Sequence, residues 1–408
     1  MMTQKSLHEL FSSYANTTGI FSNKGTLSSD FTPNNIPHRE KQIQELAMIL
    51  RPVLRGEKPS NLFIYGKTGT GKSLCIRKVS NTLQEVSSGT GNGLKVIYIN
   101  CKMRKVADTE YRLLAQIISY FGKDVPFTGL PTNNLYKELY NLIDSNGGNV
   151  IFVLDEIDAL LEKVGDDILY NLTRINQDLS RAKITIVGIS NKVSFIDNLD
   201  PRIRSSLSEE EMIFPPYNAN ELRDILSERS STAFNDGSVD HAVLTKCAAL
   251  AAQEHGDARK ALDLLRVAAE LAERANSGRV TEHHVDIAEE KLDRDRIIEI
   301  IRAQPKQSKL VMLAVLSLFK RGQKNMQTGE VYELYERLAL ENGLKTLTQR
   351  RVSDLISELD IMGVINASVV SKGRYGRTRK INIQLGQKIV ALLSKTLGAE
   401  FPEAFINF

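Results

Sequence analysis

Short apolar runs alternate with amphipathic stretches through the first half of the chain. The runs are continuously apolar, as strands buried on both faces of a parallel sheet are. The stretches between them have helical or polar patterns, which is typical of βα units in a doubly wound sheet. An amphipathic helix at 40–50 precedes the first run, because Ile43, Leu46, Ala47 and Leu50 recur at helical spacing. The predicted strands are residues 61–65, 95–100, 150–154, 184–189 and 212–214.

The pattern changes twice after residue 216. It first becomes purely helical, which predicts a small helical lid with helices at 220–229, 239–254, 257–275 and 281–296. The last hundred residues predict three helices at 308–320, 328–340 and 348–362, followed by strands at 364–370 and 378–385. Three helices and a hairpin are the order of a winged helix, a variant of the helix-turn-helix.

These patterns predict an α/β domain with a parallel sheet, a helical lid and a C-terminal winged helix. The expected boundaries are a flexible N-terminal segment at 1–30, the α/β domain at 31–216, the lid at 217–300 and the winged helix at 301–408. A length of 408 residues supports two or three domains, each able to bury its own core.

Composition excludes several classes of protein. A hydrophobic content of 42% and a charged content of 25% are ordinary for a globular chain and argue against wholesale disorder. Cys75, Cys101 and Cys247 lie far apart, which predicts a reduced intracellular protein without disulfides or a cysteine zinc site. No run of about 18 apolar residues predicts a membrane span, and the polar N-terminus lacks the apolar core of a secretory signal. We therefore expect a cytoplasmic protein.

The net charge of +4 hides an asymmetry between parts of the chain. Residues 301–408 carry 17 Lys and Arg against 9 Asp and Glu, a net of +8, and the remaining 300 residues carry a net of −4. Such asymmetry indicates a nucleic-acid-binding module joined to something else, although many basic domains bind nothing.

The first candidate for chemistry is a glycine-rich loop between the strand at 61–65 and a helical stretch. Its sequence fits G-x-x-x-x-G-K-[ST], and this strand–loop–helix context distinguishes a phosphate-binding loop from a flexible loop that matches by accident. Backbone N–H groups and the helix N-terminus face the phosphates, the lysine reaches the β- and γ-phosphates, and the serine hydroxyl ligates Mg²⁺. The loop consists of Gly66, Lys67, Thr68, Gly69, Thr70, Gly71, Lys72 and Ser73.

A pair of carboxylates supports this interpretation. Asp155 and Glu156 follow five apolar residues, at the carboxyl end of a central strand, where ligands bind in open α/β sheets. A carboxylate there needs a cation or a donor, and Mg²⁺ is the natural partner of Asp155. Glu156 is then placed to orient or deprotonate the attacking water. The alternative is a solvated Asp-Glu pair in a turn.

Three further polar residues have weaker individual signals. Asn191 follows the strand at 184–189 and either holds the nucleophilic water or simply forms a turn. Arg202 is suited to bridging a transferring phosphoryl group, in its own chain or from a neighbour, but isolated surface arginines are common. Arg259 opens a predicted lid helix, an unfavourable place for a cation unless a triphosphate compensates.

The winged helix has two candidate DNA-binding clusters. Gln349, Arg350 and Arg351 avoid the apolar stripe of the helix at 348–362 and lie at its N-terminal end, where recognition helices contact bases. The hairpin tip at 372–380 has five positive charges and two glycines and no acidic residue, which favours DNA contact over a merely solvated tip. The charged residues, glycines and tyrosine of the tip are Lys372, Gly373, Arg374, Tyr375, Gly376, Arg377, Arg379 and Lys380.

The order of these motifs resembles the AAA+ ATPases, and the detail resembles the archaeal origin-recognition and cell-division-control initiators. The resemblance covers about residues 31–385. The loop itself is shared by a very large superfamily. Two features narrow the resemblance to the initiators: Pro37-His38-Arg39-Glu40 ahead of the loop, and the succession of AAA+ core, lid and winged helix. It implies that Gly66–Ser73 are Walker A, Asp155 and Glu156 Walker B, Asn191 sensor 1, Arg202 the arginine finger and Arg259 sensor 2.

The resemblance also implies two binding regions. Pro37, His38 and Arg39 fall where AAA+ proteins line the adenine pocket. Residues 100–122, with Lys102, Arg104 and Lys105, fall where initiators insert a helix that touches DNA; the residues alone indicate only a helix with a basic start. Serine replaces the commoner threonine at position 73, and either hydroxyl can ligate Mg²⁺.

The expected function is that of an ATP-dependent replication initiator with ATP or ADP and Mg²⁺ as cofactors. It would hydrolyse ATP slowly, as a switch, and bind double-stranded origin DNA. The resemblance implies partners in the replicative helicase, which it would recruit or load, and in related initiator paralogues. Two alternatives stay open: an AAA+ motor or clamp-loader-type remodeller, and a transcription regulator switched by nucleotide.

Overall fold

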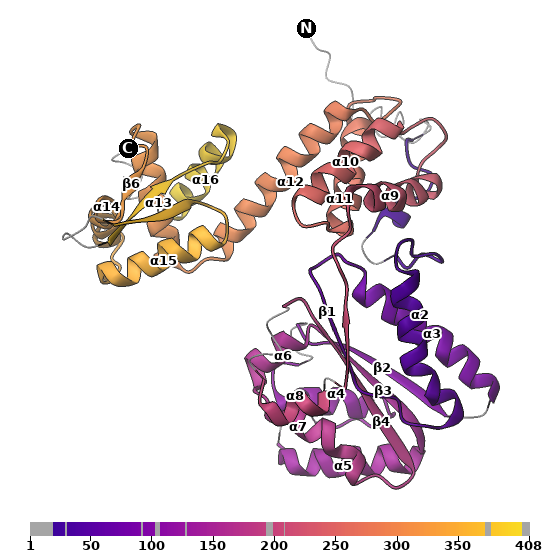
Figure 1. The fold of residues 1–408 in the computed structure, drawn as a ribbon. Helices are drawn as coiled ribbons and strands as arrows, with labels where there is room; N and C mark the ends of the chain where they lie inside the picture. Colours follow the sequence, from indigo (N-terminus) through magenta and orange to yellow (C-terminus); the bar gives the residue numbers. More distant parts are fainter. Residues whose placement is uncertain are drawn as a thin grey trace. The chain divides into compact units, whose positions relative to one another are not determined.

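The computed structural model describes residues 19–28, 31–90, 93–102, 107–126, 129–192, 199–207, 209–371 and 377–401. Contacts within the chain divide it into two compact units, Met1–Ala288 and Glu289–Phe408 (Figure 1). The first unit contains a parallel sheet with helices on both faces and a helical lid. The second contains helices and a small antiparallel sheet.

The sheet of the first unit has five parallel strands in the order β2-β3-β4-β1-β5. All five predicted strands are present, with ends displaced by at most two residues. Because the chain crosses from β1 to the far edge of the sheet at β2 and later from β4 past β1 to β5, the strand that leads into the phosphate-binding loop lies between β4 and β5. The strands are β1 (Leu62–Tyr65), β2 (Leu94–Asn100), β3 (Gly148–Asp155), β4 (Ala182–Ser190) and β5 (Glu210–Ile213).

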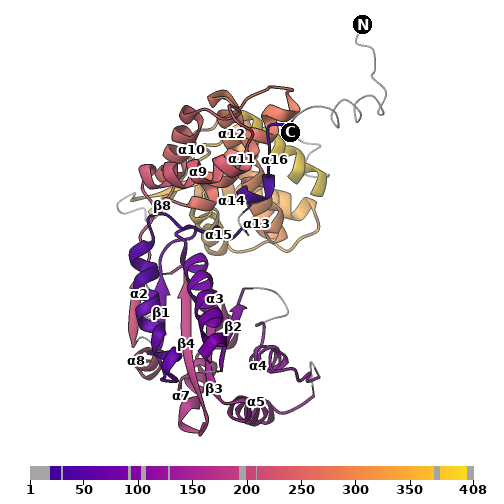
Figure 2. The ribbon, with the colours of Figure 1, turned by 90° about the vertical axis from the view of Figure 1, so that its right-hand side faces the viewer.

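Helices cover both faces of this sheet (Figures 1 and 2). Alternation along each strand sends successive side chains to opposite faces. Leu62 and Ile64 pack with α2 (Glu40–Leu50) and α3 (Lys72–Thr90), while Phe63 packs on the opposite face. That opposite face is covered by α4 (Glu110–Ser119), α5 (Thr132–Asn146), α6 (Ile157–Val164), α7 (Asp167–Arg174) and α8 (Pro201–Leu207).

The lid consists of α9 (Ala219–Ala233), α10 (His241–Gln253), α11 (Ala258–Arg274) and the start of α12 (Glu282–Ala303). Asn218 and Glu221 form a capping box that begins α9. The helix predicted at 281–296 is shorter than the observed one. Helix α12 continues to Ala303, because Ile298 and Ile301 are buried in the core of the second unit. No helix in the described part of the chain, α12 included, is long and apolar enough to cross a membrane.

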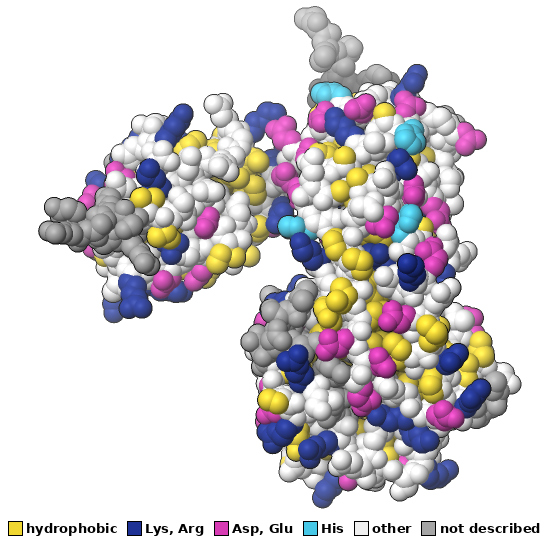
Figure 3. All heavy atoms as spheres, in the orientation of Figure 1, with side chains coloured by type: hydrophobic (Ala, Val, Ile, Leu, Met, Phe, Trp, Pro, Cys, Tyr) yellow, Lys and Arg dark blue, Asp and Glu magenta, His cyan; other side chains and the backbone are white. Residues whose placement is uncertain are grey.

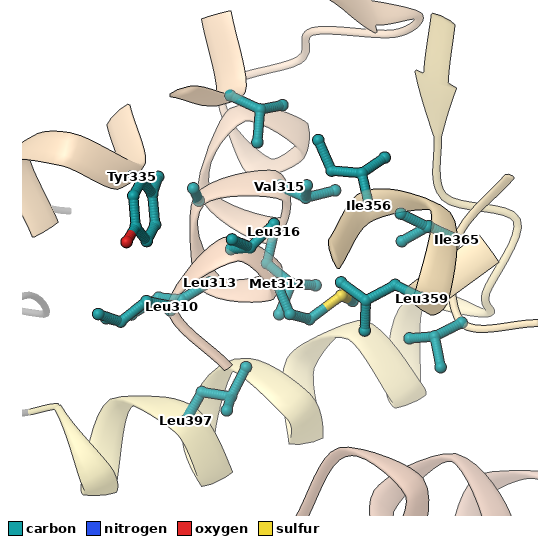
Figure 4. Packing of buried hydrophobic residues seen from close by; sticks show 14 of the residues in the cluster. Leu310, Met312, Leu313, Val315, Leu316, Tyr335, Ile356, Leu359, Ile365 and Leu397 are labelled. Atoms are coloured by element: carbon teal, nitrogen blue, oxygen red, sulfur yellow. The ribbon is translucent and has the colours of Figure 1, made fainter. Parts of the chain in front are cut away.

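The second unit packs around α13 (Lys306–Lys320), whose side chains are buried on nearly all sides (Figure 4). Tyr335 of α14 (Thr328–Glu341), Leu359 of α15 (Gln349–Ile361) and Leu397 of α16 (Gln387–Glu400) point toward it. The predicted hairpin is formed by β7 (Asn366–Ser371) and β8 (Arg377–Asn382), and the short β6 (Met326–Gln327) adds a third antiparallel strand. The winged-helix prediction is confirmed, but β6 and α16 were not predicted.

Two nearby positions of α15 allow the contribution of core packing to stability to be tested against a surface position on the same helix. Leu359 is fully buried, whereas Ile361 is 85% exposed. We expect Leu359→Ala to lower the free energy of opening of the second unit by about 2–5 kcal/mol, because it leaves a cavity. Ile361→Ala should change it by less than about 0.5 kcal/mol. Native-state hydrogen exchange of the α13 amides in the full chain measures both, and equal effects would contradict this packing.

Candidate nucleotide and DNA sites

The phosphate-binding loop lies between β1 and α3 and touches the lid. Gly69 has a φ of +68°, and a Cβ there would lie 1.7 Å from Asp257 Oδ1 of the lid, so no side chain fits at this position. The backbone N–H of Ala258 donates to Gly69 O at 3.2 Å. The loop that would hold the phosphates therefore also carries a direct contact with the first turn of α11.

Lys72 is buried under the loop that it belongs to. Its Nζ donates to Gly66 O at 2.7 Å, to Lys67 O at 2.7 Å and to Asn191 Oδ1 at 2.9 Å. Burial lowers the pKa of Lys72 to about 8, although the charge of Asp155 acts in the opposite direction. A buried ammonium group with its charge only partly compensated is well matched to the oxygen atoms of a phosphate.

The Asp155 carboxylate is buried at the end of β3 and accepts three hydrogen bonds. Ser73 Oγ donates to Oδ2 at 2.7 Å, the hydroxyl of Tyr98 donates to the same oxygen, and the backbone N–H of Glu156 donates to Oδ1 at 3.0 Å. Burial and the neighbouring Asp155 charge raise the pKa of Tyr98 above its usual value, so the phenol stays protonated. Ser73 and Asp155 bring hard oxygen donors together, which is the donor set that Mg²⁺ prefers.

Glu156 follows in an unusual backbone conformation. Its φ of 56° and ψ of 47° lie in the left-handed region, which costs a non-glycine residue about 1–2 kcal/mol. Such strain is common at functional sites, where it aims a side chain. The Glu156 carboxylate lies 3.4 Å from Nζ of Lys102, whose side chain is 72% exposed. Lys102, which the family resemblance assigned to DNA, is thus also an ion-pair partner of Glu156.

A cavity of about 310 Å³ runs between the α/β core and the lid. Its polar lining includes residues 68–73 of the loop, Asp155, Glu156, Asn191 and Arg259. Its apolar lining comes from Phe31, Ile36, Pro37, Ile225 and Leu262, with further polar groups from Asn35 and Glu228. The polar lining with its ammonium group suits the phosphates of a nucleotide, and the apolar lining suits a base.

The three residues of the expected adenine pocket have different positions. Pro37 lines the cavity, whereas the His38 ring is 3.1 Å from Asp224 of the lid. Arg39 is buried and donates to Thr70 O at 2.9 Å, His38 O at 3.0 Å and Pro215 O at 2.6 Å, with its guanidinium 3.7 Å from the ring centre of Tyr217. Its donors are directed at backbone carbonyls, so Arg39 supports the loop from behind.

Arg202 lies outside this cavity. Its guanidinium makes a forked bond to Asp200, at 3.1 Å to Oδ1 and 2.9 Å to Oδ2, and its side chain is 68% exposed. That bond lowers the pKa of Asp200 to about 2. Arg202 therefore does not line the cavity of its own chain, whereas Arg259, on the first turn of α11, does.

The predicted DNA-binding residues are only partly within the described residues. Gln349, Arg350 and Arg351 are exposed at the N-terminus of α15, where Thr348 caps the helix by accepting from Arg351 N. Arg379 and Lys380 lie on β8. Figure 3 shows Lys and Arg side chains among Asp and Glu on the visible surface of the second unit. Arg104, Lys105, Lys372, Gly373, Arg374, Tyr375 and the side chain of Arg377 lie outside the described residues.

Reasoning from the sequence missed three groups at the nucleotide cavity. Tyr98 bonds to Asp155 across neighbouring strands, and Asp257 packs against Gly69. Arg229 of α9 is buried beside the cavity and donates to Thr26 O at 3.2 Å, with its guanidinium 4.7 Å from the ring centre of Phe31. Burial lowers the pKa of Arg229. All three depend on contacts between elements far apart in the sequence, so no local pattern marks them.

A parallel sheet with a Walker-type loop, a helical lid that contacts this loop, and a winged helix define a AAA+ ATPase joined to a winged-helix module. Three family profiles match the chain: "AAA domain" at residues 55–193, "Cdc6 AAA+ ATPase-type lid domain" at 223–290 and "CDC6, C terminal winged helix domain" at 299–391. The chain belongs to the ORC1-type DNA replication proteins, the archaeal Orc1/Cdc6 family of replication initiators.

Individual relatives match nearly the whole chain. It is 52% identical to the ORC1-type DNA replication protein of Thermococcus onnurineus, over 94% of this chain and 93% of that protein. The identity to the Pyrococcus furiosus protein is also 52%, over 94% and 91%. The structure of the Aeropyrum pernix ORC1 protein in complex with DNA superposes with a TM-score of 0.84, at 45% identity, over 95% of this chain and 99% of that one. The resemblance predicted from the sequence is confirmed.

Lys72 provides the first test of the cavity. We expect Lys72→Ala to weaken nucleotide binding by roughly 10- to 100-fold, because a charge-assisted contact with the phosphates is lost. Equilibrium titration with a fluorescent ATP analogue measures this. Lys137→Ala on α5 removes the same charge from an exposed position and should bind as the unmodified chain does. Equal affinities for all three proteins would show that the cavity is not the phosphate site.

Proposed function

We propose that the chain is an ATP-dependent initiator that binds double-stranded origin DNA and helps to recruit or load the replicative helicase. ATP binding and hydrolysis act as a switch between two states of the lid. The observation that carries this proposal is the shared use of one loop: residues 68–73 line the cavity, and Gly69 simultaneously contacts Asp257 and Ala258 of the lid. Nucleotide occupancy and lid position are therefore coupled at a single place.

The geometry supports the following roles for the site residues. Lys72 exchanges its loop carbonyl partners for the β- and γ-phosphates, and Arg259 approaches the same phosphates from the lid. Ser73 and Asp155 would hold Mg²⁺, which supplies charge neutralisation for the phosphates. Glu156 orients and deprotonates the attacking water, and Asn191 places that water beside Lys72. Pro37 lines the base end of the cavity, and His38 and Arg39 support it.

Hydrolysis is proposed to be slow and regulatory. Glu156 would leave its ion pair with Lys102 before acting as a base, and Arg202, which is bonded to Asp200 and does not line the cavity of its own chain, would act on the phosphates of a neighbouring protomer. A single chain would then lack a complete catalytic set. A rapid motor or clamp-loader-type remodeller, the alternative reading, would turn over well above about 1 s⁻¹ with DNA.

DNA binding is proposed for two surfaces. The winged helix contributes Gln349, Arg350 and Arg351 at the N-terminus of α15, together with the wing at 372–380, which follows α15 in the sequence. The AAA+ core contributes Lys102 and Arg104. The structure of the Aeropyrum pernix ORC1 protein, to which this chain is similar, is a complex with DNA, and this supports the proposal. The chain would then be a cytoplasmic protein associated with DNA, with helicase and initiator paralogues as its protein partners.

Footprinting on origin DNA tests the switch. Protection is measured with ATP, with ADP and without nucleotide, for the unmodified chain and for Glu156→Gln, which should bind ATP but hydrolyse it at least about 100-fold more slowly. We expect the ATP footprint to convert to the ADP footprint with time in the unmodified chain and to persist in the variant. Glu162→Gln, a 65% exposed residue of α6, is the control. Identical footprints in all three nucleotide conditions would contradict a switch, and protection of many promoters instead of origins would favour a transcription regulator.

The wing is tested by charge removal. Arg374→Ala combined with Arg377→Ala should lower affinity for double-stranded DNA and reduce the slope of log K against log salt by about 2, because each phosphate contact releases counterions. Lys388→Ala with Lys395→Ala on α16 removes two charges from the same unit and should leave the slope unchanged. If the wing variant keeps the affinity and slope of the unmodified chain, the wing does not contact DNA.

A further inference from the structure

The hydroxyl of Tyr98 donates a hydrogen bond to the Asp155 carboxylate, the group proposed to hold Mg²⁺. We propose that Tyr98 is a positioning residue for the magnesium–nucleotide complex: its hydroxyl fixes the orientation in which the Asp155 carboxylate receives the cation. This inference rests on the proposed use of Mg²⁺ and ATP at the cavity. It assigns a role to a residue of β2, a strand that contributes nothing to the Walker motifs.

Strand register explains why this tyrosine can reach the carboxylate. β2 and β3 are parallel, with Asn100 opposite Asp155 and Tyr98 opposite Val153. Residues two apart on a strand share a face, so Tyr98 and Asp155 project to the face covered by α3. Tyr98 lies two residues before Asn100, the residue opposite Asp155. A phenol side chain is long enough to reach across this offset, and it has only two side-chain torsions to restrict. The hydroxyl is thus delivered by a rigid element.

A second contact fixes the ring itself. The guanidinium carbon of Arg77 lies 4.3 Å from the centre of the Tyr98 ring, a cation–π geometry. Arg77 is one helical turn after Ser73 on α3, so both residues lie on the same helix face. Helix α3 therefore contacts the pair twice, with Ser73 on the carboxylate and Arg77 on the ring. Both residues also line the nucleotide cavity.

The Asp155 carboxylate needs the Tyr98 hydroxyl as a further donor if the Ser73 hydroxyl is to turn toward a cation. Oδ2 of Asp155 accepts from both Ser73 and Tyr98, and Oδ1 accepts from the backbone N–H of Glu156. When Ser73 directs its oxygen toward a cation, the bonds from Tyr98 and from the Glu156 amide remain. Two donors on different oxygens prevent rotation of the carboxylate, whereas the amide alone would not. Residues behind a metal ligand commonly change metal affinity by 10- to 100-fold.

Tyr98→Phe removes the hydroxyl and keeps the ring under Arg77. In the full chain, binding of a fluorescent ATP analogue is measured as a function of Mg²⁺ concentration and separately in EDTA. We expect the Mg²⁺ concentration at half-maximal enhancement to rise roughly tenfold. The affinity in EDTA should stay within about twofold of that of the unmodified chain, because the contacts of the loop with the phosphates are retained.

Tyr136→Phe is a matched control. The Tyr136 hydroxyl also donates to a carboxylate within the α/β domain, Oε1 of Glu110 at 2.6 Å, but Glu110 does not line the cavity, whereas Asp155 does. Its Mg²⁺ midpoint should equal that of the unmodified chain. An unchanged midpoint in Tyr98→Phe would overturn the proposal, as would an equal loss of affinity with and without Mg²⁺. Absence of any Mg²⁺ dependence in the unmodified chain would instead contradict the proposed function on which the inference rests.

Discussion

Burial of two opposite charges at the carboxyl end of the central strands is the constraint on which the nucleotide site depends. The Lys72 ammonium and the Asp155 carboxylate both leave water, and each needs fixed partners there. Lys72 takes two loop carbonyls and Asn191, and Asp155 takes Ser73, Tyr98 and a backbone amide. The lowered pKa of Lys72 shows that desolvation outweighs the attraction of the carboxylate. This arrangement suits the anionic phosphates of a nucleotide, and in the proposed function a cation would join them at Asp155.

The same loop also determines where the lid lies. Gly69 meets Asp257 so closely that any Cβ would displace one of them, and Arg39 ties Thr70 to Pro215, the segment that leads from the sheet to the lid. Gly66 is packed against the carbonyl of Phe214 in the same segment. The loop is thus joined to the lid and to the segment that leads to it by short, direct contacts on both sides. Under the proposed function, these contacts are the route by which one additional phosphate would shift the lid.

The sequence was informative where chemistry and local pattern coincide. The five strands, the phosphate-binding loop and the winged-helix order were predictable because each has a local signature. The bond between Tyr98 and Asp155 joins residues far apart in sequence and depends on strand register, which no local pattern contains. β6 has only two residues, too few for a periodicity. By contrast α16 was detectable, since Ile389, Leu393 and Leu397 recur at a spacing of four.

Charge explains how a chain with a small net charge can be suited to DNA. Residues 301–408 carry a net charge of +8. Within this region, the charged residues of α15 are not distributed evenly along the helix. Its first turn has no acidic residue, and its carboxylates, Asp354 and Glu358, lie in later turns beside Arg351. The exposed N-terminus of α15 therefore combines Arg350 with the partial positive charge of the helix end, and both favour a phosphate. The carboxylates offset part of the charge of Arg351, so in the proposed DNA-binding role Arg350 would contribute the stronger attraction to the backbone and Arg351 the better-oriented donor.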